Sequence, residues 1–246
     1  MANNKTILIT GGAKRIGLAI CHYIHDRGYN LIVTYNKSIK EARNLKKELN
    51  QVRASSCDII KMNFTGSTNF KQFYKKIMQS FGRVDVLINN ASKFYPTNMK
   101  MINEKNWNDL IDTNLKTPLF LSKVFKDELK KRKGSIINII DIHADPPLKD
   151  HIIYNISKAG LLSLTKTLAK DLAPHVRVNG VSPGAIMWPK QDLSNIKKQK
   201  EILSRIPLKR AGNPNDIAKA VLFLIEQSDY VTGQNINVDG GRKLHM

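Results

Sequence analysis

The chain has 246 residues, 41% of them hydrophobic and 24% charged, and its 40 lysines and arginines against 20 acidic residues give a formal net charge of +20. These fractions are those of an ordinary globular protein, no apolar run approaches the ~20 residues that span a bilayer, and the first residues lack the pattern of a secretory signal. Cys21 and Cys57 have neither metal-ligand nor CxxC spacing. We therefore expect a cytoplasmic protein without a metal site.

The basic excess points either to nucleic acid or to small anionic ligands. The lysines are scattered over the expected helices, with KKRK at 130–133 as the one tight run, and no aromatic residues are interleaved with them to stack on bases. We favour a solvated basic surface that attracts an anionic ligand, and expect no nucleic-acid partner. A non-enzymatic, nucleic-acid-binding protein is the alternative, and it predicts binding that weakens with salt.

The first 28 residues have the order strand, glycine turn and helix. Lys5–Thr10 is a short apolar and β-branched run, TGGAKRIG follows at 10–17, and a helical pattern continues to Gly28. This order is typical of the first half of a dinucleotide-binding unit, in which free amides at the helix N-terminus bind a pyrophosphate. Gly11 and Gly17 suit the tight turn and the close approach of helix and strand; a purely structural loop is the alternative.

The residues after the second expected strand, Asn30–Tyr35, indicate which dinucleotide binds. Asn36, Lys37 and Ser38 follow, and no acid occurs before Glu41. A carboxylate here would bind the ribose 2′-hydroxyl of NAD, whereas a cation and two hydrogen-bonding groups suit the 2′-phosphate of NADP. We therefore predict NADPH as the cofactor. In a lysine-rich chain, a loop lysine without a function is the alternative for Lys37.

Strand-like runs alternate with helical patterns along the whole chain. This alternation predicts one α/β domain over 1–246, a Rossmann fold with a doubly wound parallel sheet of about seven strands flanked by helices. The further strands are expected at 54–63, 84–89, 135–140 and 176–181, and the further helices at 41–50, 70–81, 155–172 and 213–225, with one or two helices over 107–131.

Tyr154 and Lys158 form the pattern with the clearest chemistry. Residues four apart on a helix lie on one face, so a phenol and an ammonium share one pocket beyond the strand at 135–140. A nearby cation lowers the pKa of a tyrosine, and Tyr154 can then give a proton to a substrate that receives hydride. Asp141 follows that strand directly. For an isolated YxxxK, a helix-start tyrosine and a solvated lysine are the alternative.

These segments resemble, in the same order, the motifs of the short-chain dehydrogenase/reductase family. Gly11, Arg15 and Gly17 take the three glycine positions of its TGxxxGxG pattern, with Arg15 as a departure. Because an arginine does not supply the backbone freedom of glycine, we assign its planar side chain to phosphates or to an anionic substrate edge. The other matching motifs are NNA at 89–91, DTN at 112–114, RVNGVSPGAI at 177–186 and TGQNINVDGG at 232–241.

Two features resemble the pteridine reductase branch of this family. NASKFYPT at 90–97 matches the NASxFYPT segment of the branch, which places Phe94 over the pterin ring. Asp141 stands 13 residues before Tyr154, where most short-chain reductases have serine and pteridine reductases have aspartate. A carboxylate can take part in proton traffic or accept hydrogen bonds from pterin N–H groups, and we expect it to titrate together with Tyr154 and Lys158. A loop-packing Phe94 and a loop-capping Asp141 are the alternatives.

The resemblance implies a complete site, including a water that Asn114 holds to relay protons to the lysine. The implied catalytic residues are Asp141, Tyr154, Lys158 and Asn114. The implied cofactor contacts are Gly11, Arg15, Ile16, Gly17, Asn36, Lys37, Ser38, Asn63, Phe64, Asn90, Ala91, Ser92, Tyr154, Lys158, Pro183, Gly184 and Ile186. The implied substrate contacts are Arg15, Ser92, Phe94, Asp141, Tyr154 and Trp188.

The function that we expect is NADPH-dependent reduction of a pteridine, a dihydropterin or dihydrofolate going to its tetrahydro form. The alternative is a general carbonyl reductase, such as a 3-oxoacyl thioester reductase, which shares the cofactor motifs but does not account for Asp141 or SKFYPT. The lysine-rich segment 188–206 is expected to be a lid over the substrate, in which Trp188 contacts either substrate or only its neighbours. The resemblance also implies a homo-oligomer, a tetramer.

Overall fold

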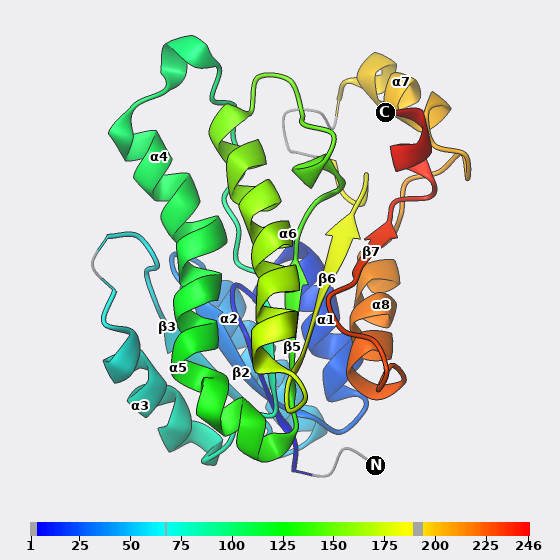
Figure 1. Ribbon diagram of the computed structural model, residues 1–246. Coiled ribbons are helices and arrows are strands. Elements are labelled where there is room, and N and C mark those ends of the chain that lie inside the picture. Colours follow the sequence, from blue (N-terminus) through cyan, green and yellow to red (C-terminus); the bar gives the residue numbers. More distant parts are fainter. Residues whose placement is uncertain (1–3, 67, 189–193) are drawn as a thin grey trace.

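The structure, a computed structural model, describes residues 4–66, 68–188 and 194–246. Within these ranges seven parallel strands form one sheet in the order β3-β2-β1-β4-β5-β6-β7 (Figure 1), which confirms the expected α/β fold. The strands are β1 (Thr6–Ile9), β2 (Asn30–Tyr35), β3 (Cys57–Lys61), β4 (Val86–Asn89), β5 (Ser135–Ile139), β6 (Arg177–Pro183) and β7 (Asn235–Val238). The helices are α1 (Arg15–His25), α2 (Ile39–Val52), α3 (Phe70–Phe81), α4 (Glu104–Ile111), α5 (Thr117–Arg132), α6 (Ile152–Leu172), α7 (Ile196–Ser204) and α8 (Pro214–Glu226). Shorter helical segments are η1 (Met99–Met101), the π-helical η2 (Asp112–Lys116), η3 (Ile142–Ala144) and η5 (Arg242–His245).

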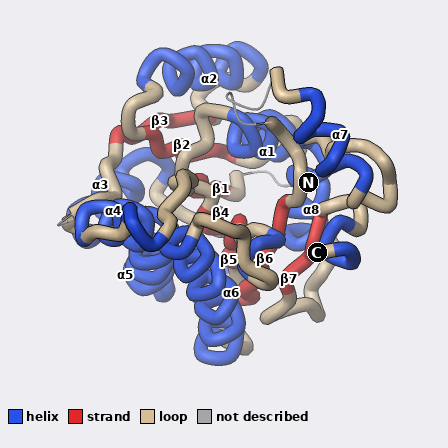
Figure 2. Tube along the Cα trace, turned by 90° about the horizontal axis from the view of Figure 1, so that it is seen from above, coloured by secondary structure: helices blue, strands red, loops and turns tan. Residues whose placement is uncertain are grey.

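The helices cover the two faces of the sheet in separate layers. α1, α2 and α8 pack on one face, and α3, α5 and α6 pack on the other, as the view from above shows (Figure 2). Within β1, Ile7 and Ile9 belong to the first hydrophobic cluster and Leu8 to the second, because successive side chains of a strand point to opposite faces. Burial on both faces explains why the central strands are continuous apolar runs.

The strand order reverses at β1, which pairs with β2 on one side and with β4 on the other. In open parallel sheets such a reversal leaves a crevice at the carboxyl ends of the strands, where ligands bind. The glycine turn 10–17 follows β1, the segment 90–97 follows β4, and Asp141 follows β5. The topology therefore brings the expected cofactor and substrate segments to one edge of the sheet.

The region 107–131, expected to hold one or two helices, belongs to α4 and α5 with the π-helical turn η2 between them. The start of one helix differs from the expectation. α6 begins at Ile152 and not at Asn155, because Thr97 caps it from a distant loop: the amide of Ile152 donates to the Thr97 carbonyl at 3.2 Å, and the amide of Ile153 donates to its hydroxyl at 3.1 Å. A cap supplied by another segment leaves no local sequence signal.

Cys21 and Cys57 are both buried free thiols. Burial raises the pKa of Cys57 to about 12 and raises that of Cys21 well above its ordinary value, so both stay protonated at neutral pH. None of the described helices is long and apolar enough to cross a membrane, and the described residues include no cluster of three or more histidine, cysteine or acidic side chains that could hold a metal ion.

Candidate active site

Tyr154, Asp141 and Lys158 meet at the carboxyl end of β5. Tyr154 Oη donates a hydrogen bond of 2.6 Å to Asp141 Oδ2, and the backbone amide of His143 donates to the other carboxylate oxygen at 2.8 Å. Lys158 Nζ lies 5.8 Å from the centre of the Tyr154 ring and donates to the carbonyl of Ile139 at 3.0 Å. Tyr154 is 3% exposed and Lys158 is 2% exposed. The site is therefore a buried phenol held between a carboxylate and an ammonium.

The pKa of Tyr154 is raised well above its ordinary value, first by burial and then by the charge and hydrogen bond of Asp141. The expected lowering of this pKa by Lys158 is therefore wrong in direction. The physical reason is that the carboxylate contacts the phenol directly, whereas the ammonium donates its hydrogen bond to Ile139. Tyr154 is thus a neutral phenol at neutral pH, which is the protonation state of a proton donor.

Burial lowers the pKa of Lys158 from 10.5 to about 8, and attraction by Asp141 offsets part of that lowering. Asp141 therefore acts on both neighbours in the same sense, because its negative charge favours the protonated form of the lysine and of the tyrosine. The three groups form one electrostatically coupled set, so a change at Asp141 alters the titration of the other two.

Phe94 is 46% exposed although its ring contacts two other aromatic rings. It stacks on His151 with a centroid separation of 4.8 Å and an interplanar angle of 15°, and it meets Tyr154 at 4.8 Å and 80°. An accessible aromatic ring therefore lies directly beside the proton donor, which suits the expected substrate contact. The sequence offers no motif for His151, whose one signal is its position a helical turn before Tyr154.

Asn114 lies in the π-helical turn η2 and is fully buried. Its Oδ1 accepts from the amide of Lys93 at 2.8 Å and from the hydroxyl of Ser92 at 3.2 Å. Its Nδ2 donates to the carbonyl of Lys93 at 2.9 Å and to the hydroxyl of Ser157 at 3.0 Å. Both atoms of the side-chain amide, which was expected to hold a water in a proton relay, are therefore hydrogen-bonded to protein groups. The side chain instead fastens the Ser92–Lys93 segment to α6, and a catalytic role for Asn114 stays a prediction.

The glycine turn after β1 is closed tightly against the segment after β4. Asn90 Nδ2 donates to the carbonyl oxygens of Thr10 and Gly11, both at 2.9 Å. Gly11 has φ +67°, and a Cβ added to it would lie 3.0 Å from the Cα of Ala91, while one added to Gly17 would lie 2.6 Å from the carbonyl oxygen of Gly11. Neither position accommodates a side chain, so the backbone itself forms this wall of the crevice.

Arg15 is the first residue of α1 and has φ +55°. This left-handed conformation favours glycine and costs another residue roughly 1–2 kcal/mol. The exposed side chain extends to the segment after β6, where Nη2 donates to the carbonyl of Met187 at 3.4 Å. Strain that a chain tolerates at such a position is typical of a functional side chain.

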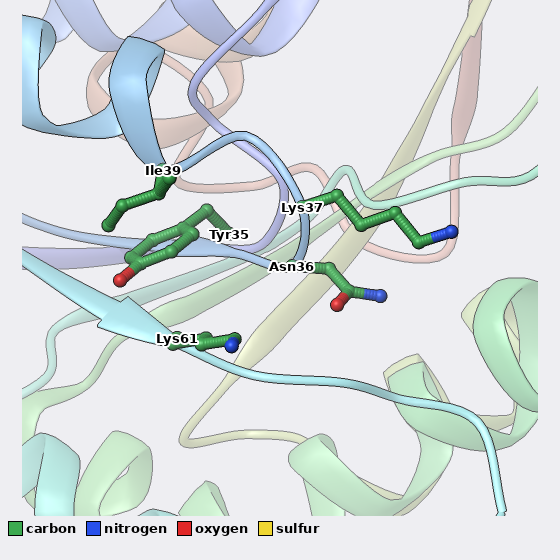
Figure 3. Close-up of a pocket in the computed structure, with 5 residues that line it drawn as sticks. All are labelled: Tyr35, Asn36, Lys37, Ile39 and Lys61. Atoms are coloured by element: carbon green, nitrogen blue, oxygen red, sulfur yellow. The ribbon is translucent and has the colours of Figure 1, made fainter.

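A cavity of about 410 Å³ lies at the ends of β2 and β3 and is lined by Tyr35, Asn36, Lys37, Ile39 and Lys61 (Figure 3). The side chains of Asn36 and Lys37 extend in the same direction beyond the strand end. Lys61 is a cation that the sequence motifs do not reveal. The register of the sheet pairs it with Tyr35, so two neighbouring parallel strands deliver their last residues to one place.

The lining of this cavity contains two cations and no carboxylate. Glu41, the first acid after β2, pairs with Lys14 at 2.6 Å, and the lysine lowers the pKa of this carboxyl group. Ser38 is the N-cap residue of α2, and Asn36 Nδ2 donates to Asn63 Oδ1 at 3.2 Å. These polar groups fit a phosphate better than a sugar hydroxyl that needs an acidic acceptor.

Three of the expected cofactor contacts have apolar side chains that pack in or against the hydrophobic core. Phe64 is 8% exposed and meets Phe73 edge-on at 6.1 Å, Ile186 is 8% exposed in the first hydrophobic cluster, and Ile16 is partly buried against the same cluster. Apolar side chains are buried in preference to facing a polar ligand. A contact of these residues with a cofactor, through their backbone, stays a prediction.

Pro183 and Gly184 lie where β6 ends beside β7. A Cβ on Gly184 would lie 2.7 Å from the Cα of Asp239, so the neighbouring strand end requires glycine here. Proximity of a cofactor is therefore not needed to explain this residue.

The described residues fit an NADP dinucleotide. Gly11 and Gly17 have no room for side chains, and the turn between them leads into the N-terminus of α1, which is the arrangement that binds a pyrophosphate. The cavity with Lys37 and Lys61 lies at the end of the next strand, where the ribose phosphate of such a cofactor is bound in this topology.

The expected lid at 188–206 is described only in part, because residues 189–193 lie outside the described residues. Trp188 is partly buried. The segment after α7 packs on the chain end that follows β7: the amide of Leu208 donates to the carbonyl of Gly240 at 3.2 Å, and a Cβ on Gly241 would lie 2.9 Å from Pro207. The lid stays a prediction.

This fold and this tyrosine–lysine pair define a short-chain oxidoreductase, and the chain belongs to the short-chain dehydrogenase/reductase family. A family model described as enoyl-(acyl carrier protein) reductase matches residues 11–243. The chain is 36% identical to a 3-oxoacyl-[acyl-carrier-protein] reductase of Staphylococcus epidermidis, over 97% of this chain and 98% of the relative. It is 35% identical to a protein of the same name from Thermotoga maritima, over 96% and 97%, and 32% identical to an acetoacetyl-CoA reductase of an Acinetobacter species, over 100% of both.

These relatives support an NAD(P)H-dependent oxidoreductase of this family. They do not support the expected pteridine reductase branch, because the most similar relatives named above carry the names of 3-oxoacyl and acetoacetyl thioester reductases. The comparisons therefore favour the alternative, a 3-oxoacyl thioester reductase, over pteridine reduction.

Proposed function

We propose that the chain is an NADPH-dependent reductase of a pteridine, and that it converts a dihydropterin or dihydrofolate to the tetrahydro form. The observation that carries this proposal is the hydrogen bond of 2.6 Å from Tyr154 Oη to Asp141 Oδ2. It fixes a carboxylate beside the proton donor at a position where a carbonyl reductase needs a second hydrogen-bond donor. NADPH, when bound, supplies the hydride.

The residues of the chain divide the remaining work. Tyr154 is a neutral phenol that can protonate a ring nitrogen of the substrate. Asp141 accepts hydrogen bonds and can accept one from an N–H group of a heterocycle, which a serine in its place would do less strongly. Phe94 offers an accessible ring for offset stacking, and Lys158 donates to the carbonyl of Ile139 at the end of β5.

The second candidate is reduction of a 3-oxoacyl thioester, and the names of the similar proteins favour it. In that reaction the ketone oxygen gains negative charge and is stabilised by donors placed around it. Tyr154 supplies one donor. An ionised Asp141 supplies none and repels the developing charge, which is the physical argument against this candidate.

The experiment that decides between them measures NADPH consumption by the purified protein with dihydrobiopterin, dihydrofolate and an acetoacetyl thioester in parallel. The same measurements are made with the Asp141→Ser variant. The proposal expects pterin-dependent NADPH oxidation that collapses in the variant. Turnover of the thioester alone by the unchanged protein, with activity retained or increased in Asp141→Ser, would overturn it in favour of the second candidate.

We also propose that the protein acts in the cytoplasm as a homo-oligomer, a tetramer, as its family suggests. Leu119 of α5 and Ile156 of α6 expose 41% and 44% of their surfaces, which supports an interface on these helices. Light scattering of the purified protein measures the oligomer. A monomer at micromolar concentration would contradict the proposal.

A further inference from the structure

Phe94 is an exposed aromatic side chain in a position fixed from both ends of its segment. The residue before it, Lys93, forms an ion pair with Asp109, and the residue after it, Tyr95, donates from its hydroxyl to the same carboxylate at 3.1 Å. Asn114 holds the backbone of Lys93 on both its amide and its carbonyl. These bonds fix the backbone of the segment but leave the orientation of the Phe94 ring to its aromatic neighbours.

The neighbour that lies flat against Phe94 is His151. Their ring planes are inclined by only 15° at a centroid separation of 4.8 Å, which is an offset stack. Tyr154 contacts Phe94 with its ring nearly perpendicular, at a centroid separation of 4.8 Å and an interplanar angle of 80°. With these two contacts 46% of the Phe94 side chain is still exposed, so accessible ring surface lies beside Tyr154.

His151 is itself held in place by its own segment. Its Nδ1 lies 2.7 Å from the carbonyl oxygen of Lys149, and since a carbonyl only accepts, this nitrogen carries the proton. The backbone around it is tied to Thr97: the amide of Thr97 donates to the carbonyl of Asp150 at 2.7 Å, and the amide of Ile152 donates back to Thr97 at 3.2 Å. The imidazole is therefore a fixed support for the Phe94 ring.

We propose that His151 is a positioning residue that sets the Phe94 ring as a platform for a flat substrate above the proton donor. The inference rests on the proposed function, because the flat substrate is taken to be a pterin. It adds a role for His151, which is to favour flat ligands over flexible ones. A planar heterocycle continues the stack, whereas an acyl thioester gains little from it.

Two substitutions separate the stack from the hydrogen bond. His151→Asn keeps a donor for the carbonyl of Lys149 but removes the ring, and His151→Phe keeps a ring but removes the donor. His175→Asn is the matched control, because His175 is exposed and lies beyond the far end of α6. Each variant is first checked for an unchanged melting temperature and for NADPH binding, and His151→Tyr replaces His151→Phe if the latter does not fold.

The readouts are the KM and kcat for dihydrobiopterin and for an acetoacetyl thioester. If the unchanged protein does not reduce the pterin, the proposed function fails, and the pterin is then measured as a competitive inhibitor of thioester reduction. His151→Asn is expected to weaken pterin affinity about 3- to 10-fold, with a smaller change in kcat and little change for the thioester. His151→Phe and His175→Asn are expected to stay within about twofold of the unchanged protein.

Several results would overturn the inference whatever the natural substrate is. They are a pterin affinity that His151→Asn leaves unchanged, a loss in His151→Phe as large as in His151→Asn, an equal loss for the thioester, and a pterin that binds none of the proteins. Equal losses in the two variants would show that an aromatic ring at this position does not preserve pterin affinity, so that stacking does not explain the role of His151.

Discussion

Replacing Asp141 by asparagine tests the electrostatic coupling at the centre of the site. The amide has nearly the shape of the carboxylate and can still accept from Tyr154 Oη, but it carries no charge. Hydrogen bonds to charged groups are worth about 1.5–3 kcal/mol, and 1.36 kcal/mol corresponds to one pKa unit. The pKa of Tyr154 should therefore fall in Asp141→Asn, while burial, the larger cause, keeps it above the ordinary value.

The assay is the tyrosinate absorbance followed against pH, with the Tyr154→Phe variant subtracted to remove the other tyrosines. The same change should appear in catalysis, because a proton donor loses activity as the pH rises through its pKa. The alkaline decline of kcat should begin at a lower pH in Asp141→Asn than in the unchanged protein. Coincident titrations of the two proteins would refute the coupling, and a higher pKa in the variant would reverse its sign.

Three further substitutions test other parts of the site. The pKa of Lys158 is about 8 in the folded chain, against an ordinary value of 10.5. Between these pH values the unfolded chain binds more protons than the folded chain, so the free energy of unfolding rises with pH, by about 3 kcal/mol from this group. Urea unfolding at several pH values should show that Lys158→Met lacks this rise, and parallel pH dependences of the two proteins would contradict it. Replacing Lys37 and Lys61 together by glutamine should weaken the binding of NADPH about 10-fold or more but leave the binding of NADH unchanged in a fluorescence titration. Each cation removed contributes roughly a factor of 3–10 to affinity at an exposed site. Lys40→Gln is the control, and equal effects on the binding of both dinucleotides would refute a phosphate site. Asn114→Ala should lower the free energy of unfolding by about 2–4 kcal/mol, because buried partners lose their hydrogen bonds, and should raise the KM for substrate by releasing the Phe94 segment; a change in kcat alone at unchanged stability would favour the water relay instead.

The strands and their positions along the chain are predictable from local sequence patterns. Buried strands such as β5 are short β-branched runs, and the glycine turn at 10–17 joins a strand to a helix. The family resemblance then orders these elements. Interactions between distant segments leave no such pattern, which is why the Thr97 cap of α6 and the π-helical turn at Asn114 are not predictable from either stretch alone.

The candidate site shows the same division. Tyr154, Lys158 and Asp141 are predictable as a group because they lie within one segment. The direction of the pKa shift of Tyr154 is not predictable, since it depends on whether the carboxylate or the ammonium reaches the phenol in three dimensions. Lys61 and His151 require the register of two strands and the meeting of two loops, and a single sequence reveals neither.

The percentage sequence identity between two members of this family and their choice of substrate depend on different residues. The matched region, 11–243, includes the glycine turn, the core of the sheet and the tyrosine–lysine pair, which serve cofactor binding and hydride chemistry for any substrate. Few residues face the substrate, so a relative at 36% identity can share the first set and differ in the second. A ketone oxygen that becomes an anion needs donors around it, whereas a heterocycle with N–H groups needs an acceptor. The carboxylate of Asp141 is an acceptor that already binds the hydroxyl of the proton donor, and the proposed pteridine substrate rests on this contact, whereas the overall similarity favours a thioester.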